Sequence, residues 1–166
     1  LLLGCAVQAA SGMWMMSFSL DVSFQEVATA SALQGFSVGI IWPPLTVATF
    51  RTIDSKYLAE TSAIFHLLRN LGSSVFISLS ITTLVRSTTV NYGRLAEFIT
   101  PYNENLQGAI ALGAADPGAA DGLARISVAV AKQAGMLGFL DAFTLYTAAC
   151  FAVFLMIPLF RIRTAA

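Results

Sequence analysis

Apolar residues fall into four long stretches of this chain, and shorter groups of polar residues separate them. The stretches cover about residues 1–20, 27–50, 62–85 and 138–160. Each is close in length to the run of roughly 20 apolar residues that an α-helix needs to cross a lipid bilayer. The pattern therefore predicts an all-α integral membrane protein with about four transmembrane helices, three of them within residues 1–85.

A long polar segment, residues 86–137, separates the third predicted span from the fourth. It is too rich in glycine, aspartate, asparagine and proline to lie in lipid as one helix. Its first part predicts a short amphipathic helix that stops near Thr100, ahead of Pro101. Its last part has apolar residues at helical spacing, and we expect that helix to continue into the fourth span.

Arginine and lysine in the short loops predict the orientation, because cytoplasmic loops carry an excess of these residues. The turn 21–26 has none, whereas the connector 51–61 and the tail 161–166 are basic. We therefore expect the connector and the C-terminus in the cytoplasm, and the turn and the long polar segment outside. The basic residues are Arg51, Lys56, Arg161 and Arg163.

Composition supports the membrane assignment. Of the 166 residues, 57% are hydrophobic and 11% are charged, and the mean hydropathy is +0.75, whereas soluble domains have about 25% charged residues. The formal net charge is zero, so nothing favours a nucleic-acid partner. Cys5 and Cys150 lie in apolar stretches without the spacing of metal ligands, so we expect core residues and no disulfide.

Catalytic motifs are absent from the sequence, which has no GxSxG, no HExxH and no phosphate-binding loop. We therefore predict no enzyme activity, no cofactor and no metal site. The chain begins at Leu1 inside an apolar run that no positively charged region precedes. We expect a C-terminal fragment of a longer protein rather than a cleavable signal peptide.

The second span carries small residues and prolines. Ser31, Gly35 and Gly39 are four residues apart and share a helix face, an arrangement that lets another helix backbone approach closely. The face could serve a moving interface or static packing. Pro43 and Pro44 remove two backbone donors, so we expect the helix to bend or break near its cytoplasmic third.

The third span carries a polar stripe that we expect to face the protein interior. His66 and Arg69 are three residues apart, and Asn70, Ser73 and Ser74 continue along nearly the same side. An arginine at that depth costs on the order of 3 kcal/mol unless it has a partner or a watery cavity. Arg69 could be a structural pair or part of a transport path. His66 could relay protons, but we favour a structural histidine.

Two further polar groups lie at span positions. Asp141, at the start of the fourth span, could be a proton or cation site, and we favour a hydrogen-bonded residue at a cavity mouth. In the first span, a polar and sulfur-rich surface could adapt to varied ligands, but we favour a lipid-facing and packing surface. Its residues are Gln8, Ser11, Met13, Trp14, Met15 and Met16.

Three segments resemble the C-terminal end of EmrB/QacA-type permeases, the fourteen-helix drug:proton antiporters of the major facilitator superfamily. They are QGFSVGIIWPPLTVATF with Gln34 and Pro44, LAETSAIFHLLRNLGSSVFISL with Arg69, and KQAGMLGFLDAFTLYTAACFAVFLMIPLF with Asp141. One departure is Gly72, which Ser73 follows where the family usually has a second glycine. The resemblance implies helices eleven to fourteen, with residues 86–137 as a large periplasmic loop.

The resemblance also implies a function, namely proton-coupled export of hydrophobic compounds, cations among them, by alternating access in the bacterial inner membrane. In Gram-negative members a periplasmic EmrA-type adaptor and an outer-membrane channel join the permease. The family's proton-coupling carboxylates would lie outside this chain. The alternative is a self-contained four-helix membrane scaffold or subunit with no transport activity of its own.

Ten residues are the candidates for functional roles. We expect five to line a transport pathway or polar interior, and these are Gln34, His66, Arg69, Asn70 and Asp141. We expect five to allow close helix packing or a helix bend, and these are Gly35, Gly39, Pro43, Pro44 and Gly72.

Overall fold

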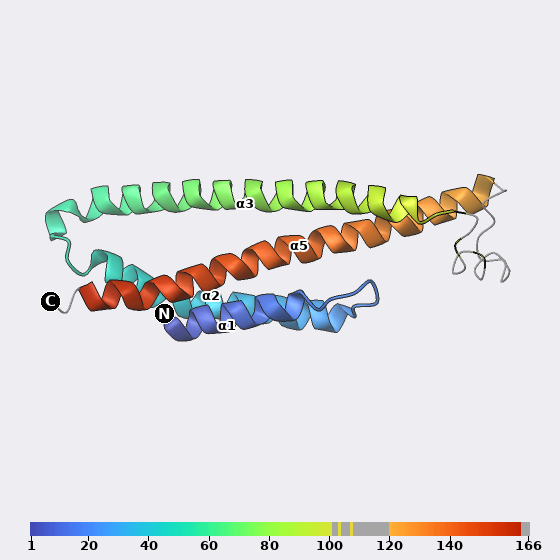
Figure 1. Cartoon of the computed structure of the whole chain (residues 1–166). Coiled ribbons are helices and arrows are strands. Elements are labelled where there is room, and N and C mark those ends of the chain that lie inside the picture. The colour runs from blue at the N-terminus through green and yellow to red at the C-terminus, as the bar shows by residue number, and fades with distance from the viewer. Residues whose placement is uncertain (101–102, 104–106, 108–119, 164–166) are drawn as a thin grey trace. The chain divides into compact units, whose positions relative to one another are not determined.

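The computed structural model describes residues 1–100, 103, 107 and 120–163. Every regular element within these residues is a helix. This confirms the all-α fold (Figure 1). The elements are α1 (Leu2–Met15), α2 (Phe24–Phe50), the 3-10 turn η1 (Ser55–Tyr57), α3 (Leu58–Glu97) and α5 (Ala120–Arg163).

Three helical segments are long and apolar enough to cross a membrane: Phe24–Phe50, Ser55–Glu97 and Gly122–Ile157. Their side chains are mostly exposed, and no residue of α3 is buried. In a bilayer such apolar side chains face lipid instead of water, so they need no protein core to cover them. The chain is therefore a multi-pass membrane protein.

The first predicted span, residues 1–20, forms a shorter helix than expected. α1 has 14 residues and ends at Met15. The Ser17 hydroxyl donates a hydrogen bond to the Trp14 carbonyl oxygen at 2.6 Å, and the Ser17 N–H donates to the same oxygen. Serine side chains compete for backbone groups in this way, which favours a turn over another helical turn.

The start of α2 is fixed by a capping box. The Glu26 N–H donates to the Ser23 hydroxyl at 3.3 Å, and the Ser23 N–H donates to the Glu26 carboxylate at 2.8 Å. Two of the N–H groups that a helix start leaves without partners are satisfied by this exchange. The cap is local in sequence, so it sets where α2 begins.

The prolines do not break α2, which continues through Pro43 and Pro44 to Phe50. A proline at either position cannot donate to the carbonyl four residues earlier, so Gly39 and Ile40 lose their helical donors. The helix nevertheless remains continuous, so the break that was predicted as one of two outcomes is absent.

α3 and α5 are longer than the spans predicted for them. α3 does not end at Val85 but continues to Glu97, so residues 86–97 of the predicted loop belong to it. α5 begins at Ala120 and runs without interruption to Arg163, which confirms that the helix before the fourth span continues into it. At 1.5 Å per residue, the 40 residues of α3 reach about 60 Å, roughly twice the hydrocarbon thickness of a bilayer. The stretch GAADPGAADG, residues 113–122, whose glycines and proline predict a turn or flexible tip, lies mostly outside the described residues.

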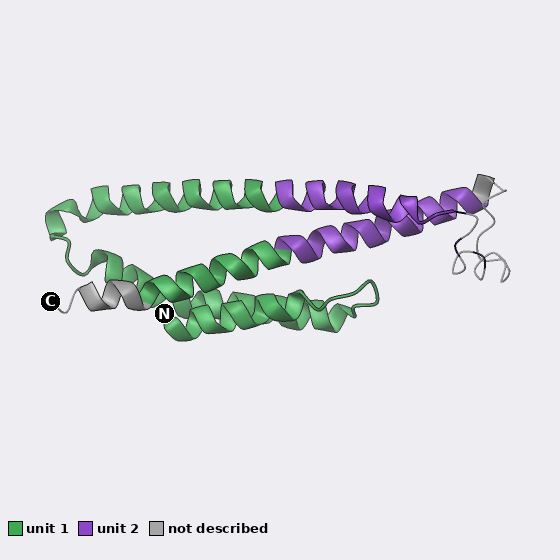
Figure 2. Cartoon of the chain, in the orientation of Figure 1, with its two compact units in different colours: residues 1–81, 143–166 green, residues 82–142 purple. Residues whose placement is uncertain are grey.

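The chain divides into two compact units, to each of which α3 and α5 contribute (Figure 2). Unit 1 consists of residues 1–81 and 143–166, and unit 2 of residues 82–142. In unit 1, α1 packs against α2 with the chains antiparallel, since Gly4 lies beside Ile41 and Ser11 bonds the Ala30 carbonyl. In unit 2, the end of α3 packs against the start of α5.

Small side chains fill the positions where helices pack most closely. Ser11, Ala30 and Ser37 have no exposed surface in unit 1, and Ala134 has none in unit 2. Small residues let helix backbones approach, which is how helices gain contact in lipid. The tight packing of this chain therefore rests on small residues rather than on large apolar ones.

The glycines at close contacts are not those predicted. A Cβ atom added to Gly35, Gly39 or Gly72 would meet nothing within 4 Å, so the described chain makes no close approach there. The close approaches are at glycines where an added Cβ would meet a neighbouring helix, and these are Gly4, Gly12 and Gly138. Spacing alone did not identify them, because it gives the helix face but not the neighbour.

Candidate functional site

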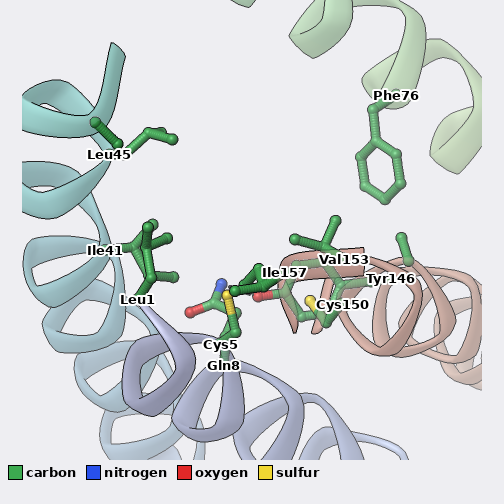
Figure 3. A pocket seen from close by; sticks show the side chains of 12 residues that line it. Leu1, Cys5, Gln8, Ile41, Leu45, Phe76, Tyr146, Cys150, Val153 and Ile157 are labelled. Carbon is green, nitrogen blue, oxygen red and sulfur yellow. Dashed lines mark hydrogen bonds between the residues drawn. The ribbon is translucent and has the colours of Figure 1, made fainter. Parts of the chain in front are cut away.

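An apolar cavity of about 590 Å³ lies in unit 1 among α1, α2 and the C-terminal part of α5, with Phe76 of α3 on its wall (Figure 3). Cavities of 300–1,000 Å³ are the size that binds small molecules. Twelve residues line it: Leu1, Cys5, Gln8, Ile41, Leu45, Ala48, Phe76, Tyr146, Ala149, Cys150, Val153 and Ile157.

A chain of hydrogen bonds crosses the three helices beside this cavity. The Ser37 hydroxyl of α2 donates to the side-chain carbonyl of Gln8 on α1. The Gln8 amide then donates to the hydroxyl of Tyr146 on α5. The bonds satisfy polar groups that would be costly to leave unpaired in an apolar surrounding. Gln8 is the residue that joins the three helices.

The remaining polar atoms of the cavity wall are two thiols. Cys5 of α1 is buried and Cys150 of α5 is half-buried, and neither forms a disulfide. Both line the cavity together with Gln8 and Tyr146 (Figure 3). None of the twelve lining side chains carries a charge, so these side chains offer dispersion contacts and neutral hydrogen bonds only.

The predicted polar stripe of α3 does not face a covered interior in this structure. His66, Arg69 and Asn70 are all exposed. Arg69 instead lies over the Trp42 indole ring of α2, with its guanidinium carbon 4.5 Å from the ring centroid. A cation over an indole face is attracted to the negative face of the ring. Arg69 therefore has an aromatic partner, and its role in a transport path stays a prediction.

An aromatic cluster surrounds that contact. Phe65 of α3 lies between Trp42 and Phe50 of α2, with centroid distances of 6.3 and 5.7 Å. The His66 ring lies edge-on to Phe65 at 5.6 Å. These contacts hold the start of α3 against the end of α2, and they place His66 beside an aromatic ring rather than beside a carboxylate.

Unit 2 contains a separate polar cluster around Asp141. The Ser87 hydroxyl of α3 donates to the Asp141 carboxylate of α5, and the Asn91 amide donates to the Ser87 hydroxyl at 3.0 Å. Arg86 and Arg94 line the same shallow pocket of about 320 Å³. Asp141 is therefore hydrogen-bonded to a second helix, and its place at the mouth of a cavity stays a prediction.

The five predicted pathway residues are divided between the two units, four in unit 1 and Asp141 in unit 2. Gln34 lies on α2, where its amide nitrogen is 3.2 Å from the Met15 sulfur of α1. Arg69, His66 and Asn70 lie on the start of α3, and Asp141 lies in unit 2. Among the residues that the structure describes, no three His, Cys, Asp or Glu side chains are placed to hold a metal ion.

The sequence did not group the polar residues of the cavity, because each is a single polar residue in an apolar helix and the helices are far apart in the sequence. Gln8 and Ser11 were expected on a lipid-facing and packing surface. Ser11 is fully buried where α1 packs against α2, which agrees with the packing part of that expectation, whereas Gln8 lines the cavity. Met13 and Trp14 are exposed, as that expectation required. The one signal in the sequence was Tyr146, a polar aromatic four residues before Cys150 on the same helix face.

Comparison with known proteins supports the family resemblance. The chain is 32% identical to the multidrug export protein EmrB of Haemophilus influenzae over 88 residues, which are 53% of this chain and 17% of that protein. It is 28% identical to the EmrB of Escherichia coli K12 over 91 residues, 55% of this chain and 18% of the relative. A probable multidrug resistance protein, EmrY of Escherichia coli K12, is 26% identical over 88 residues.

The matched part of the chain therefore spans less than a fifth of the length of these relatives. No protein-family model matches the chain, and no solved structure matches it significantly. The likeness to EmrB-type proteins that the sequence motifs indicated is confirmed.

Proposed function

We propose that this chain, as an EmrB-like membrane segment, forms part of a proton-coupled multidrug efflux transporter that exports hydrophobic compounds by alternating access. The observation that carries the proposal is the similarity of about half of the chain to proteins named multidrug exporters. Three helices of spanning length and an uncharged cavity among helices fit a protein that handles apolar compounds in a membrane.

The proposed setting is the bacterial inner membrane, with the C-terminus in the cytoplasm. The basic residues of the connector and the tail support this orientation, because cytoplasmic loops carry an excess of lysine and arginine. In this orientation unit 2 would extend on the periplasmic side, because α3 is about twice as long as the bilayer core is thick. A periplasmic EmrA-type adaptor is the partner that the family resemblance implies for that side.

Transport through two bundles that rock about a central cavity needs more helices than these, so the proposal assigns the proton-coupling groups to a longer protein. Within this chain, the proposed pathway residues are His66, Arg69, Asn70, Asp141 and Gln34. Their assignment rests on polar character within apolar spans, where ionisable groups usually serve a function.

The test uses the complete open reading frame that encodes the chain, expressed in a bacterium that lacks its own efflux pumps. Retention of a fluorescent hydrophobic compound is followed with and without a proton uncoupler. Arg69→Ala is compared with the wild type and with Ser74→Ala. Among the described residues, the exposed Ser74 hydroxyl bonds only the Asn70 carbonyl of its own helix, α3. Immunoblots of membranes keep the three proteins at equal amounts.

The proposal predicts extrusion that the uncoupler abolishes, and that falls with Arg69→Ala but not with Ser74→Ala. Normal extrusion by Arg69→Ala would remove Arg69 from the pathway. A wild type that extrudes none of a panel of neutral, cationic and acidic hydrophobic dyes would favour the alternative, a membrane scaffold without transport activity.

A further inference from the structure

We infer that the unit 1 cavity is a binding site for uncharged apolar molecules that carry one hydrogen-bond acceptor, such as an aromatic ketone. The inference rests on the proposed export function for its biological meaning, and it narrows the substrate class from hydrophobic compounds in general to neutral ones. The site is defined by Gln8, Tyr146, Cys5 and Cys150 and the apolar residues around them (Figure 3).

The size and the lining of the cavity suit a small apolar molecule. A volume of about 590 Å³ is in the middle of the range for small-molecule sites. Aliphatic side chains of α2 and α5, together with Leu1 and the Phe76 ring, form most of the wall. An apolar ligand would gain dispersion contacts on several sides, whereas a void of this size would leave those side chains without partners.

The side chains of the cavity wall are uncharged. None of the lining residues is Asp, Glu, Lys, Arg or His. A cation placed inside an apolar bundle without a counter-charge pays a penalty equivalent to roughly a hundredfold in affinity. The cavity therefore discriminates against permanent cations.

Gln8 provides a polar anchor at the cavity wall. The Gln8 amide has two N–H donors, and its hydrogen bond to the Tyr146 hydroxyl uses one of them. Its carbonyl is occupied by the Ser37 hydroxyl, which fixes the orientation of the amide. No described residue accepts a hydrogen bond from the second N–H, so this N–H can donate to a ligand acceptor. A donor held in one orientation in an apolar site discriminates more strongly than a mobile one.

The experiment uses benzophenone, a neutral aromatic ketone that also inserts into nearby C–H bonds under ultraviolet light. The full-length protein is irradiated in membrane vesicles with benzophenone or with its quaternary ammonium derivative, (4-benzoylbenzyl)trimethylammonium. Mass spectrometry then measures adducts on peptides that contain the cavity residues Val153 and Ile157. Adducts on the exposed α2 and α3 residues Phe36 and Leu68 serve as an internal reference for the membrane concentration of each probe.

We expect benzophenone to label the cavity residues, and the ratio of cavity to reference adducts to fall at least tenfold for the cationic probe. Equal ratios for the two probes would overturn the inference. Adducts confined to the reference residues would also overturn it, because they would mean that another segment of the protein fills the cavity. This comparison uses the wild-type protein only, so it does not depend on a variant that folds.

Variants then test the anchor. Gln8→Leu should lower the ratio of cavity to reference adducts about fivefold, because the loss of a typical hydrogen bond lowers affinity about fivefold. Ser74→Ala should leave this ratio unchanged. An unchanged ratio in a folded Gln8→Leu protein would overturn the role of the amide. The labelling assay does not depend on transport. A protein that extrudes dye but shows no cavity labelling would overturn this inference alone. A protein whose cavity is labelled but that extrudes no dye would overturn the proposed function alone.

Discussion

The guanidinium carbon of Arg69 lies 4.5 Å from the centroid of the Trp42 indole ring, so the one arginine inside the third predicted span covers an aromatic ring of α2. The two residues are 27 positions apart and lie on consecutive helices. The contact gives Arg69 a partner without a carboxylate. It also joins α2 just before its two prolines to the first part of α3, where aromatic contacts of Phe65 add to it.

We expect Trp42 and Arg69 to be energetically coupled. A cation–π contact contributes about 0.5–2 kcal/mol, depending on how much water is excluded. The single variants Trp42→Leu and Arg69→Ala and the double variant form a cycle, measured as unfolding free energies in detergent titrations. The coupling energy should be about 1 kcal/mol. Additive effects of the two single variants would mean that the contact contributes nothing in the membrane protein.

Gly138 should tolerate no side chain, whereas Gly135 on the same helix should. A Cβ atom at Gly138 would lie 2.8 Å from the Leu84 carbonyl oxygen and would also meet the Thr88 hydroxyl, while one at Gly135 would meet nothing within 4 Å. Gly138→Ala should therefore cost about 1–3 kcal/mol of stability. Gly135→Ala should be neutral or stabilise by up to about 1 kcal/mol, because alanine favours helix.

The measurement is thermal unfolding of both variants in the same detergent. Unfolding temperatures that change equally for Gly135→Ala and Gly138→Ala would contradict the close approach of α3 and α5 in unit 2.

Gly4 and Gly39 offer a similar pair in unit 1. An added Cβ at Gly4 would meet the Ile41 side chain and lie 3.3 Å from the Ser37 carbonyl oxygen, whereas Gly39 faces open space. We expect Gly4→Ala to be about 1–3 kcal/mol less stable than Gly39→Ala. If Gly39→Ala is the more damaging change in the full-length protein, the four-residue spacing of small residues serves a helix contact made with another segment.

Asp141 should depend on its hydrogen bond rather than on its charge. Asp141→Asn keeps an acceptor for the Ser87 hydroxyl and should change the unfolding free energy by less than about 0.5 kcal/mol. Asp141→Leu removes the acceptor and should cost about 1–2 kcal/mol. Uncoupler-sensitive extrusion is measured on both variants at matched amounts. A stable Asp141→Asn protein that no longer extrudes would make Asp141 a proton or cation site.

Much of the fold could be predicted from the sequence because the signals are local. Apolar stretches of spanning length predicted α2, α3 and α5, and the apolar spacing before the fourth span predicted the continuous α5. The ends were less predictable. α1 ends at Met15 because Ser17 makes a turn, and α3 continues to Glu97 although its last turns are polar. A polar composition indicates exposure to water and does not by itself end a helix.

The candidate site was less predictable than the fold. Arg69, Gln34 and Asp141 were found because polar groups are conspicuous in apolar spans. The cavity residues were not grouped, since Gln8 and Tyr146 are 138 positions apart and each is an ordinary polar residue in its own helix.

The sequence by itself determined that the chain is helical, that it crosses a membrane and that it is similar to EmrB-type proteins, because hydropathy and short motifs are properties of neighbouring residues. Only the tertiary structure decided which glycines lie against another backbone and which polar side chains meet. Among the described residues, Gly4 and Gly138 lie against neighbouring helices and Gly39 does not, although all three lie in helices. The physical reason is that close packing depends on the rotation and register of two helices, and neither is encoded within one of them.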